Sequence, residues 1–165
     1  MPAPLTPTHP ASCARRTGWR SLELHTEIDI DADPERIWAV LTDFPAYAAW
    51  NPCIPKAAGE ARAGSRLEVK IAWPGLTPGP YVLQVLDVKP ARELRWLGHL
   101  GRPGLMDGDH RFLIEPIGSD RSRLTQRERF SGWLVPLMAP WLRRNVLVGF
   151  ERMNAALKAR VEGVA

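Results

Sequence analysis

Three polar residues in the second half of the chain have the types and spacing that acid-base chemistry requires. Residues 109–130 alternate polar and apolar side chains on either side of the turn sequence Gly118-Ser-Asp120, a pattern that predicts a β-hairpin. A turn centred there places His110 opposite Glu128, with Gln126 two residues away on the same side of the sheet. A carboxylate that hydrogen-bonds to an imidazole fixes its tautomer and raises its pKa, so the pair predicts a proton donor or acceptor.

A buried pair of this kind has two interpretations. In the first, His110 and Glu128 act as acid and base, and polarise a ligand carbonyl or assist an aldol-type cyclisation. In the second, the two side chains only satisfy each other near the end of the sheet and fix the hairpin register. Gln126 has two matching interpretations, because its amide could orient a ligand hydroxyl or carbonyl, or bond locally.

The side of the hairpin that carries these residues is otherwise apolar, which indicates that it faces the interior. Other predicted strands and the C-terminal helix add inward aromatic side chains, and an aromatic lining with a few polar groups is typical of a small-molecule site. The alternative is that the aromatic side chains simply fill the interior. The residues that we expect to line a ligand cavity are Thr26, Trp73, Trp96, His110, Phe112, Gln126, Glu128, Met138 and Trp141.

The inward face needs a cover, and residues 133–161 are predicted to supply it as one long helix with a kink near its start. From Leu142 onward, apolar residues recur at spacings of three and four. Pro136 and Pro140 each remove a helix hydrogen bond, so the helix should begin or bend there. The stretch from Trp133 to Arg144 is apolar on nearly all sides before it ends in two arginines. It could contact a membrane surface, cover the cavity or simply pack against the sheet.

The N-terminal part of the chain divides into a leader and the start of a domain. Residues 1–18 contain four prolines and no periodicity, so we expect a flexible leader followed by a single domain over residues 19–165. Residues 22–30 alternate as a strand, and Asp33-Pro34 provides an N-cap and first residue for a short helix. A second helical turn is expected before residue 50.

The middle of the chain predicts further strands separated by turn sequences. Apolar and polar side chains alternate, and proline- and glycine-rich loops lie between the alternating segments. The glycines from Gly98 to Gly108 are interpreted as part of a long connection. The strands are predicted over residues 67–73, 81–88 and 93–100.

Composition restricts the class of protein. Lys and Arg number 22 against 18 Asp and Glu, and the resulting net charge of +4 is too small to indicate a nucleic-acid partner. Outward arginines of the hairpin should be neutralised by Glu23, Glu27 and Asp29 of the first strand. No apolar run is long enough to span a membrane.

The cysteines and histidines indicate neither a disulfide framework nor a metal centre. Cys13 and Cys53 are far apart with no signal peptide before them, which favours a reducing cytoplasm. The four histidines lack metal-ligand spacing, and His25 and His99 should point outward. We therefore expect no metal and no cofactor.

Several short motifs accompany these elements, namely Thr26 to Ile30, Asp33-Pro-Glu-Arg-Ile-Trp38, Trp50-Asn51-Pro52, Pro90-Ala-Arg-Glu-Leu-Arg-Trp96, His110-Arg-Phe112 and Glu128-Arg-Phe130. With the order of the elements, they resemble the START-like (SRPBCC) superfamily and in particular its bacterial polyketide cyclase/dehydrase-like branch, over about residues 20–162. The resemblance implies an α+β helix-grip fold. In that fold a curved antiparallel sheet of about seven strands wraps around a long C-terminal helix, and two short helices follow the first strand. It also implies a cavity between sheet and helix.

Three functions are compatible with this resemblance. The first is binding of a small hydrophobic ligand such as a lipid, a quinone or an aromatic polyketide. The second is an enzyme of the cyclase, dehydrase or hydrolase type that uses His110 and Glu128. The third is a co-chaperone-like interaction module with a closed interior. The sequence predicts no particular oligomeric state.

Overall fold

The computed structural model describes residues 12–74 and 77–163, which form one antiparallel sheet and a set of helices on its concave side. The strands are β1 (Ser12–Gly18), β2 (Ser21–Ile30), β3 (Lys56–Ala58), β4 (Arg66–Ile71), β5 (Gly79–Lys89), β6 (Glu93–His99), β7 (Asp107–Gly118) and β8 (Arg121–Ser131). The helical segments are α1 (Pro34–Thr42), η1 (Phe44–Ala46), α2 (Tyr47–Trp50), α3 (Val135–Trp141), η2 (Leu142–Val146) and α4 (Leu147–Glu162).

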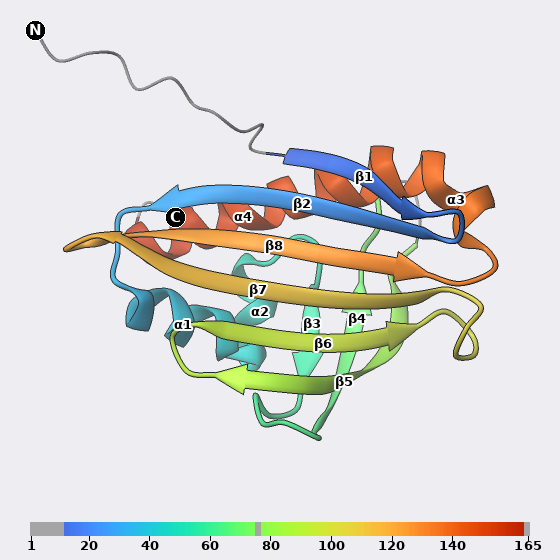
Figure 1. Cartoon of the computed structure of the whole chain (residues 1–165). Coiled ribbons are helices and arrows are strands. Elements are labelled where there is room, and N and C mark those ends of the chain that lie inside the picture. Colours follow the sequence, from blue (N-terminus) through green and yellow to red (C-terminus); the bar gives the residue numbers. More distant parts are fainter. Residues whose placement is uncertain (1–11, 75–76, 164–165) are drawn as a thin grey trace, which may run out of the picture.

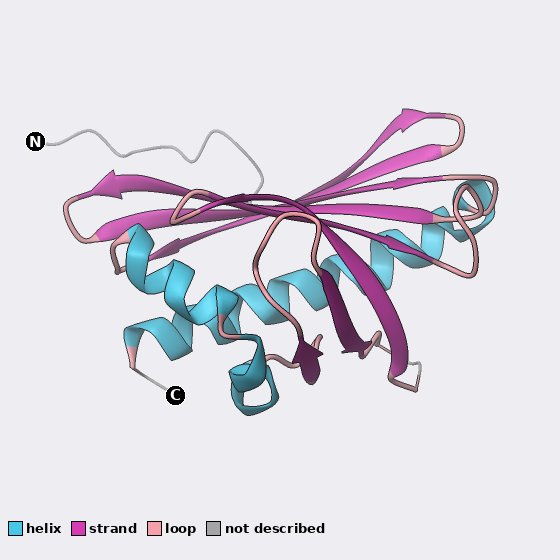
Figure 2. Cartoon of the chain, turned by 90° about the horizontal axis from the view of Figure 1, so that it is seen from below, coloured by secondary structure: helices cyan, strands magenta, loops and turns pink. Residues whose placement is uncertain are grey.

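The strands follow the order β1-β2-β8-β7-β6-β5-β4-β3 across the sheet (Figure 1). Figure 2 shows that the long helical run of α3, η2 and α4 lies along one face of the sheet. The strands at one edge of the sheet curve towards that face, beside the helix. The short helices after β2 lie next to the C-terminal end of α4. This is the predicted helix-grip architecture, with eight strands instead of about seven.

Two strands, β1 and the short β3, were not placed from the sequence, and β1 corrects the predicted leader. Residues 12–18 pair antiparallel with β2, from Ser12 opposite Thr26 to Gly18 opposite Ser21. As an edge strand with mostly exposed, polar side chains, β1 has no apolar alternation for the sequence to reveal. The rest of the predicted leader, residues 1–11, lies outside the described residues.

The first helix begins as its sequence predicts. The Asp33 carboxylate accepts a hydrogen bond from the Arg36 backbone N–H at 2.7 Å, and Pro34 occupies the first turn, where its missing donor costs nothing. Ile37 and Leu41 are the buried positions of α1. The predicted second helical segment is also present, as η1 and α2.

The C-terminal helix is irregular in its first turns, where its two prolines lie. Pro136 lies in the first turn of α3, and Pro140 lies inside it. A π-helical turn, η2, follows directly and leads into α4. A π-turn after a proline lets the helix continue without the hydrogen bond that the ring removes. Among the described residues, no helix is long and apolar enough to cross a membrane.

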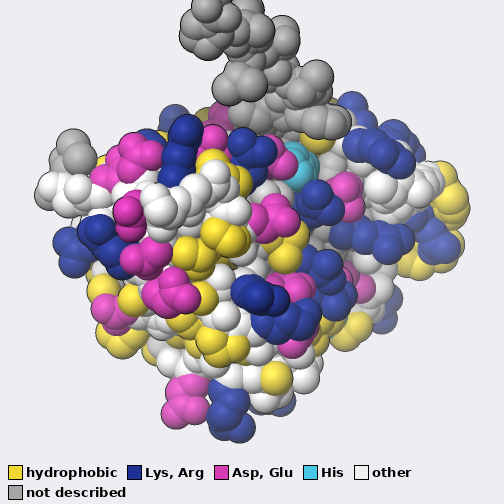
Figure 3. Space-filling model, turned by 60° about the vertical axis from the view of Figure 1, so that its left-hand side comes forward, with side chains coloured by type: hydrophobic (Ala, Val, Ile, Leu, Met, Phe, Trp, Pro, Cys, Tyr) yellow, Lys and Arg dark blue, Asp and Glu magenta, His cyan; other side chains and the backbone are white. Residues whose placement is uncertain are grey.

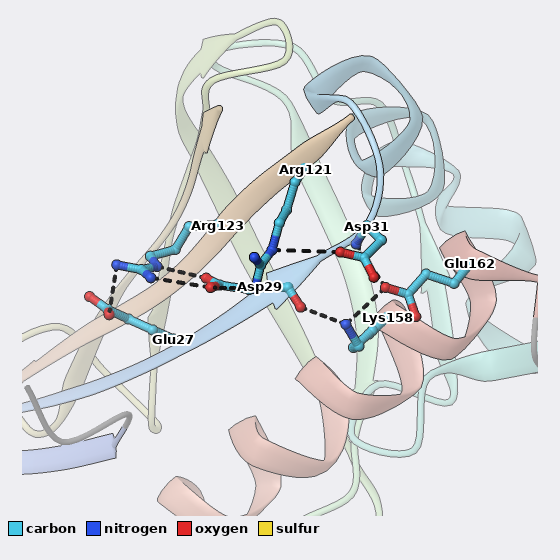
Figure 4. A network of polar contacts seen from close by, with 7 residues as sticks. All are labelled: Glu27, Asp29, Asp31, Arg121, Arg123, Lys158 and Glu162. Atoms are coloured by element: carbon cyan, nitrogen blue, oxygen red, sulfur yellow. Dashed lines mark hydrogen bonds and ion pairs between the residues drawn. The ribbon is translucent and has the colours of Figure 1, made fainter. Parts of the chain in front are cut away.

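Ion pairs join β2 to β8, and a hydrogen bond joins α4 to β2 (Figure 4). Asp29 accepts hydrogen bonds from Arg123 at 2.8 Å and from Arg121 at 3.2 Å, and these contacts hold the pKa of its carboxyl below the usual value. Lys158 donates to the Asp29 carbonyl at 2.7 Å and pairs with Glu162 at 2.8 Å. The predicted neutralisation of the outward hairpin arginines is therefore confirmed at Asp29.

Candidate functional site

The predicted hairpin register is confirmed for β7 and β8. His110 lies opposite Glu128 and Phe112 opposite Gln126, and all four side chains are buried. The register shifts only beyond Pro116, near the turn. Because side chains alternate along a strand, this register brings His110, Gln126 and Glu128 together on the concave side of the sheet.

His110 hydrogen-bonds to Gln126 instead of Glu128, which corrects the predicted pair. Its Nε2 lies 3.0 Å from Gln126 Oε1, whereas its Nδ1 lies 3.9 Å from Glu128 Oε2, too far for a hydrogen bond. The Phe112 ring stacks on the imidazole with centroids 4.4 Å apart, and Phe150 lies on it at 4.7 Å. These contacts fix the imidazole plane, so His110 cannot turn towards Glu128 without displacing its neighbours.

A chain of buried side-chain hydrogen bonds continues from Gln126 to the C-terminal helix. The Gln126 amide donates to Asn154 Oδ1 at 2.6 Å, and the Asn154 amide donates to Thr26 Oγ1 at 3.0 Å. The Phe150 carbonyl, which can only accept, lies 3.4 Å from Gln126 Nε2. The Gln126 oxygen therefore faces His110, whose Nε2 carries the donated proton and whose Nδ1 is the free acceptor.

Burial leaves both members of the predicted pair uncharged at neutral pH. Desolvation lowers the pKa of His110 to about 3, although the Gln126 hydrogen bond and the charge of Asp109 oppose it. Desolvation, with a smaller contribution from Asp109, raises the pKa of Glu128 to about 8. The expected rise in the His110 pKa is thus wrong, because burial in apolar surroundings disfavours the imidazolium. The two side chains form no ion pair.

A cavity of ≈ 90 Å³ lies between the sheet and the C-terminal helix, over the inward side of His110 and Glu128. Apart from these two residues and His99, its walls are apolar or aromatic side chains and glycines. The lining residues are Cys53, Ile54, Ile71, Trp73, Tyr81, Leu83, Trp96, Gly98, His99, Leu100, Met106, Gly108, His110, Glu128, Phe130, Trp141, Leu142, Phe150 and Met153.

Five of the nine residues predicted to line the cavity do so, namely Trp73, Trp96, His110, Glu128 and Trp141. The other four lie elsewhere. Thr26 and Gln126 are fully buried in the polar chain beside the cavity. Phe112 is buried behind His110, and Met138 packs against the apolar cluster under α3. Their inward direction was predicted correctly, but not their distance from the cavity.

Two lining glycines were interpreted as loop residues, whereas they are strand residues. Gly98 of β6 lies directly opposite Gly108 of β7. A Cβ at Gly108 would lie 2.5 Å from Glu128 Oε1, so the absence of a side chain there leaves room for the carboxyl. A Cβ at Gly98 would lie 2.7 Å from a methyl group of Leu83. The paired glycines therefore let neighbouring side chains fold over the sheet at the cavity wall.

His99 and Cys53 also line the cavity, although the sequence did not indicate it. His99, which was predicted to point outward, is half-buried, and its Nδ1 lies 2.6 Å from Asp107. The Cys53 thiol donates to the Gly149 carbonyl at 2.8 Å, and burial raises its pKa to about 11. A thiol in this state is a small apolar wall group, not a nucleophile.

The chemistry of the site centres on Glu128. Its Oε2 is buried and has no hydrogen-bond partner within residues 12–74 and 77–163. A protonated carboxyl facing an apolar cavity is a hydrogen-bond donor, and it can give up its proton near neutral pH. Across the described ranges, no group of three or more His, Cys, Asp or Glu side chains is placed to hold a metal ion.

Comparisons with known proteins place the chain among proteins of this architecture. Residues 21–162 match the model of the family described as polyketide cyclase/dehydrase and lipid transport. No curated protein matches the sequence significantly. The fold is similar to that of a START superfamily protein from Mycobacterium smegmatis, at 24% identity and a TM-score of 0.72, covering 87% of this chain and 99% of that chain.

Two enzymes have the same fold at lower identity. One is the Zhui aromatase/cyclase from Streptomyces sp. R1128, at 18% identity and a TM-score of 0.72, covering 86% of this chain and 94% of that one. The other is norcoclaurine synthase from Thalictrum flavum, solved with dopamine and hydroxybenzaldehyde. It is 14% identical with a TM-score of 0.67, covering 100% of this chain and 98% of that one. At these identities the similarity concerns the fold alone.

Proposed function

Because the chain belongs to the polyketide cyclase/dehydrase and lipid transport family of the START-like superfamily, we propose that it binds one small, largely apolar molecule in the cavity. The observation that carries this proposal is the unpaired, protonated carboxyl of Glu128 in an apolar lining. A buried polar atom without a partner costs about 1–3 kcal/mol. A ligand oxygen that accepts the Glu128 proton would recover much of that free energy.

The lining suggests the class of ligand. Trp73 and Trp141 meet edge to face, with ring centroids 6.2 Å apart, and Trp96 lies on the opposite wall beside His110. Aromatic walls around ≈ 90 Å³ suit a compact ring system better than a long acyl chain. We therefore propose a quinone-like or aromatic polyketide-like molecule with a carbonyl or hydroxyl oxygen directed at Glu128.

The geometry favours binding over acid-base catalysis by His110 and Glu128. An imidazole with a pKa of about 3 is a poor base at neutral pH, and its Nε2 proton is already donated to Gln126. Glu128 alone retains the protonation state of a general acid. An enzyme that protonates a bound carbonyl through Glu128 is therefore the second candidate. The third, an interaction module with a closed interior, is disfavoured by the cavity.

The proposal can be tested with a ligand pair that differs by one oxygen. The probe is 1-tetralone, a bicyclic ketone, and its control is tetralin, the same ring system without the carbonyl. Titration calorimetry should show 1-tetralone binding more tightly than tetralin to the wild type. Glu128→Leu should bind both equally, because it has lost the donor, with a loss for 1-tetralone of about tenfold, as for one hydrogen bond.

Two further measurements separate the parts of this proposal. Trp96→Ala removes an apolar wall without touching the donor and should weaken binding of both compounds. Native mass spectrometry of protein from its natural host should show a bound small molecule. If neither compound binds the wild type and no molecule accompanies the protein, the cavity is not a binding site. If the wild type binds both compounds with equal affinity, only the proposed role of Glu128 is refuted, and the cavity remains a binding site.

A further inference from the structure

The end of the molecule at α3 carries exposed apolar side chains close together. Trp133 precedes α3 and is 66% exposed, and Leu137 on α3 is 78% exposed. Trp19, in the β1–β2 turn, is 63% exposed, and its ring lies edge to face with that of Trp133 at 5.9 Å. Six large hydrophobic side chains are exposed in the described parts of the chain, and three of them are here. Such grouping distinguishes a surface site from scattered apolar residues.

Arginines surround this apolar group. Arg20 lies over both tryptophan rings, 4.6 Å from the Trp19 centroid and 4.0 Å from the Trp133 centroid. Arg102 borders a shallow hollow beside Trp133, and Arg143 and Arg144 are exposed on η2. We call the whole set the α3-end surface, and it comprises Trp19, Arg20, Arg102, Trp133, Leu137, Arg143 and Arg144.

The arginines of the α3-end surface are uncompensated. Considering only residues 12–74 and 77–163, none of the four takes part in an ion pair. Several basic side chains elsewhere do have acidic neighbours. Arg121 and Arg123 are paired with Asp29, and the face in Figure 3 carries interspersed basic and acidic groups. The α3-end surface is therefore locally positive as well as apolar.

We propose that the α3-end surface docks on an anionic lipid bilayer. Tryptophan rings prefer the boundary between lipid headgroups and acyl chains, where Trp19 and Trp133 would lie with Leu137. The arginines would bind lipid phosphates, which complement their charge and their planar donors. A protein partner would equally cover apolar side chains, but four arginines without an ion pair among the described residues favour an anionic surface.

The α3-end surface adjoins the elements that cover the cavity. The Trp133 and Leu134 backbone N–H groups donate to the Gly104 and Leu105 carbonyls, which holds the loop between β6 and β7 against the start of α3. The same loop and η2 contribute Leu100 and Leu142 to the cavity wall. Docking would thus bring lipid next to the cavity cover. The proposal goes beyond ligand binding and does not depend on it.

Vesicle flotation tests the proposal on the full chain. The probes are vesicles of phosphatidylcholine alone and of equal parts phosphatidylcholine and phosphatidylglycerol. The wild type should float with the anionic vesicles, bind weakly to the neutral ones and dissociate in high salt. Arg143→Gln with Arg144→Gln should weaken binding by roughly 25-fold, from about fivefold per arginine. Trp133→Ser with Leu137→Ser should weaken it by at least about tenfold.

Matched controls lie at the opposite end of the sheet. Ile117, at the β7–β8 turn, is also an exposed apolar residue, and Arg92, at the β5–β6 turn, is exposed. Ile117→Ser and Arg92→Gln should bind as the wild type does. Absence of wild-type binding to anionic vesicles would overturn the proposal, as would equal losses in the control variants. Self-association that Leu137→Ser abolishes, without vesicle binding, would show instead that this surface joins two copies of the chain.

Discussion

Replacing Glu128 with glutamine should change how the stability of the protein depends on pH. The folded-state pKa of Glu128 is about 8, against 4.5 for an exposed glutamate, because the carboxyl is buried in an apolar wall. Between these two values the folded protein holds a proton that the unfolded chain has released. Unfolding therefore becomes easier as the pH rises through this window, and the free energy of unfolding falls. Glutamine has no such proton to lose.

The size of the effect follows from the pKa difference. In the window between 4.5 and 8, the proton retained by the folded protein lowers the free energy of unfolding by up to about 1.4 kcal/mol per pH unit. From pH 5 to pH 7.5, the wild type should lose about 3 kcal/mol relative to Glu128→Gln. His110 is present in both proteins. Its lowered pKa reduces the stability of both as the pH falls below 6.5, so its effect largely cancels in the difference.

Urea unfolding of both proteins at several pH values between 5 and 8 measures this difference. The free-energy advantage of Glu128→Gln should grow steadily with pH. Glu68→Gln, which changes an exposed carboxyl on β4, is the matched control and should show a difference that stays constant. A constant difference for Glu128→Gln as well would mean that Glu128 ionises in the folded protein as it does in water. The neutral donor assumed for ligand binding would then not exist.

Three other substitutions or reactions test separate parts of the structure. Gly108→Ala should displace the Glu128 carboxyl, because the new Cβ would lie 2.5 Å from Oε1. Urea unfolding should show that the free energy of unfolding falls by about 1–3 kcal/mol, and calorimetry should show a weaker affinity for 1-tetralone. Gly132→Ala should cost about 2 kcal/mol or more in the same unfolding assay, because Gly132 has φ +130° and a carbonyl oxygen 2.5 Å from the Cβ position. N-ethylmaleimide at pH 8 should label exposed Cys13 rapidly and buried Cys53, with its pKa of about 11, only after unfolding, as peptide mass spectrometry would report. Unchanged stability in either alanine variant, or equal labelling of both thiols, would contradict the corresponding packing.

The hairpin register was predictable because two local signals agree. The turn at residues 118–120 fixes which residues face each other, and period-two alternation fixes which side is buried. His110, Gln126 and Glu128 could therefore be placed on one face from the sequence alone. Their hydrogen bonds could not, because three polar groups on one face can pair in several ways. The choice depends on Asn154, which comes from a helix distant in sequence.

The protonation state of His110 and the strand positions of two glycines could not be predicted from the sequence, for different reasons. The pKa of His110 depends on how many apolar atoms surround it, including Phe150 from α4, and the sequence pattern does not report that number. Gly98 and Gly108 have no side chain that could contribute to an alternating pattern, so a glycine in a strand cannot be distinguished from a glycine in a loop. The exposed edge strand β1 escaped prediction because alternation becomes visible only when one face is buried.

The buried hydrogen bonds of Thr26, Asn154 and Gln126 hold the fold together, whereas Glu128 is the proposed ligand contact. Asn154 is the one amide among the buried side chains of α4, and it bonds to both Gln126 and Thr26. Sliding the helix by one turn would break both of these bonds and leave the Asn154 side chain buried without them, so they set the position of α4 on the sheet. The Gln126 oxygen and the His110 Nε2 proton are paired with each other. Among the described residues, Glu128 is then the hydrogen-bond donor of the cavity wall that the scaffold leaves unpaired. Asn154→Leu should therefore reduce stability first, whereas Glu128→Leu should reduce ligand affinity first.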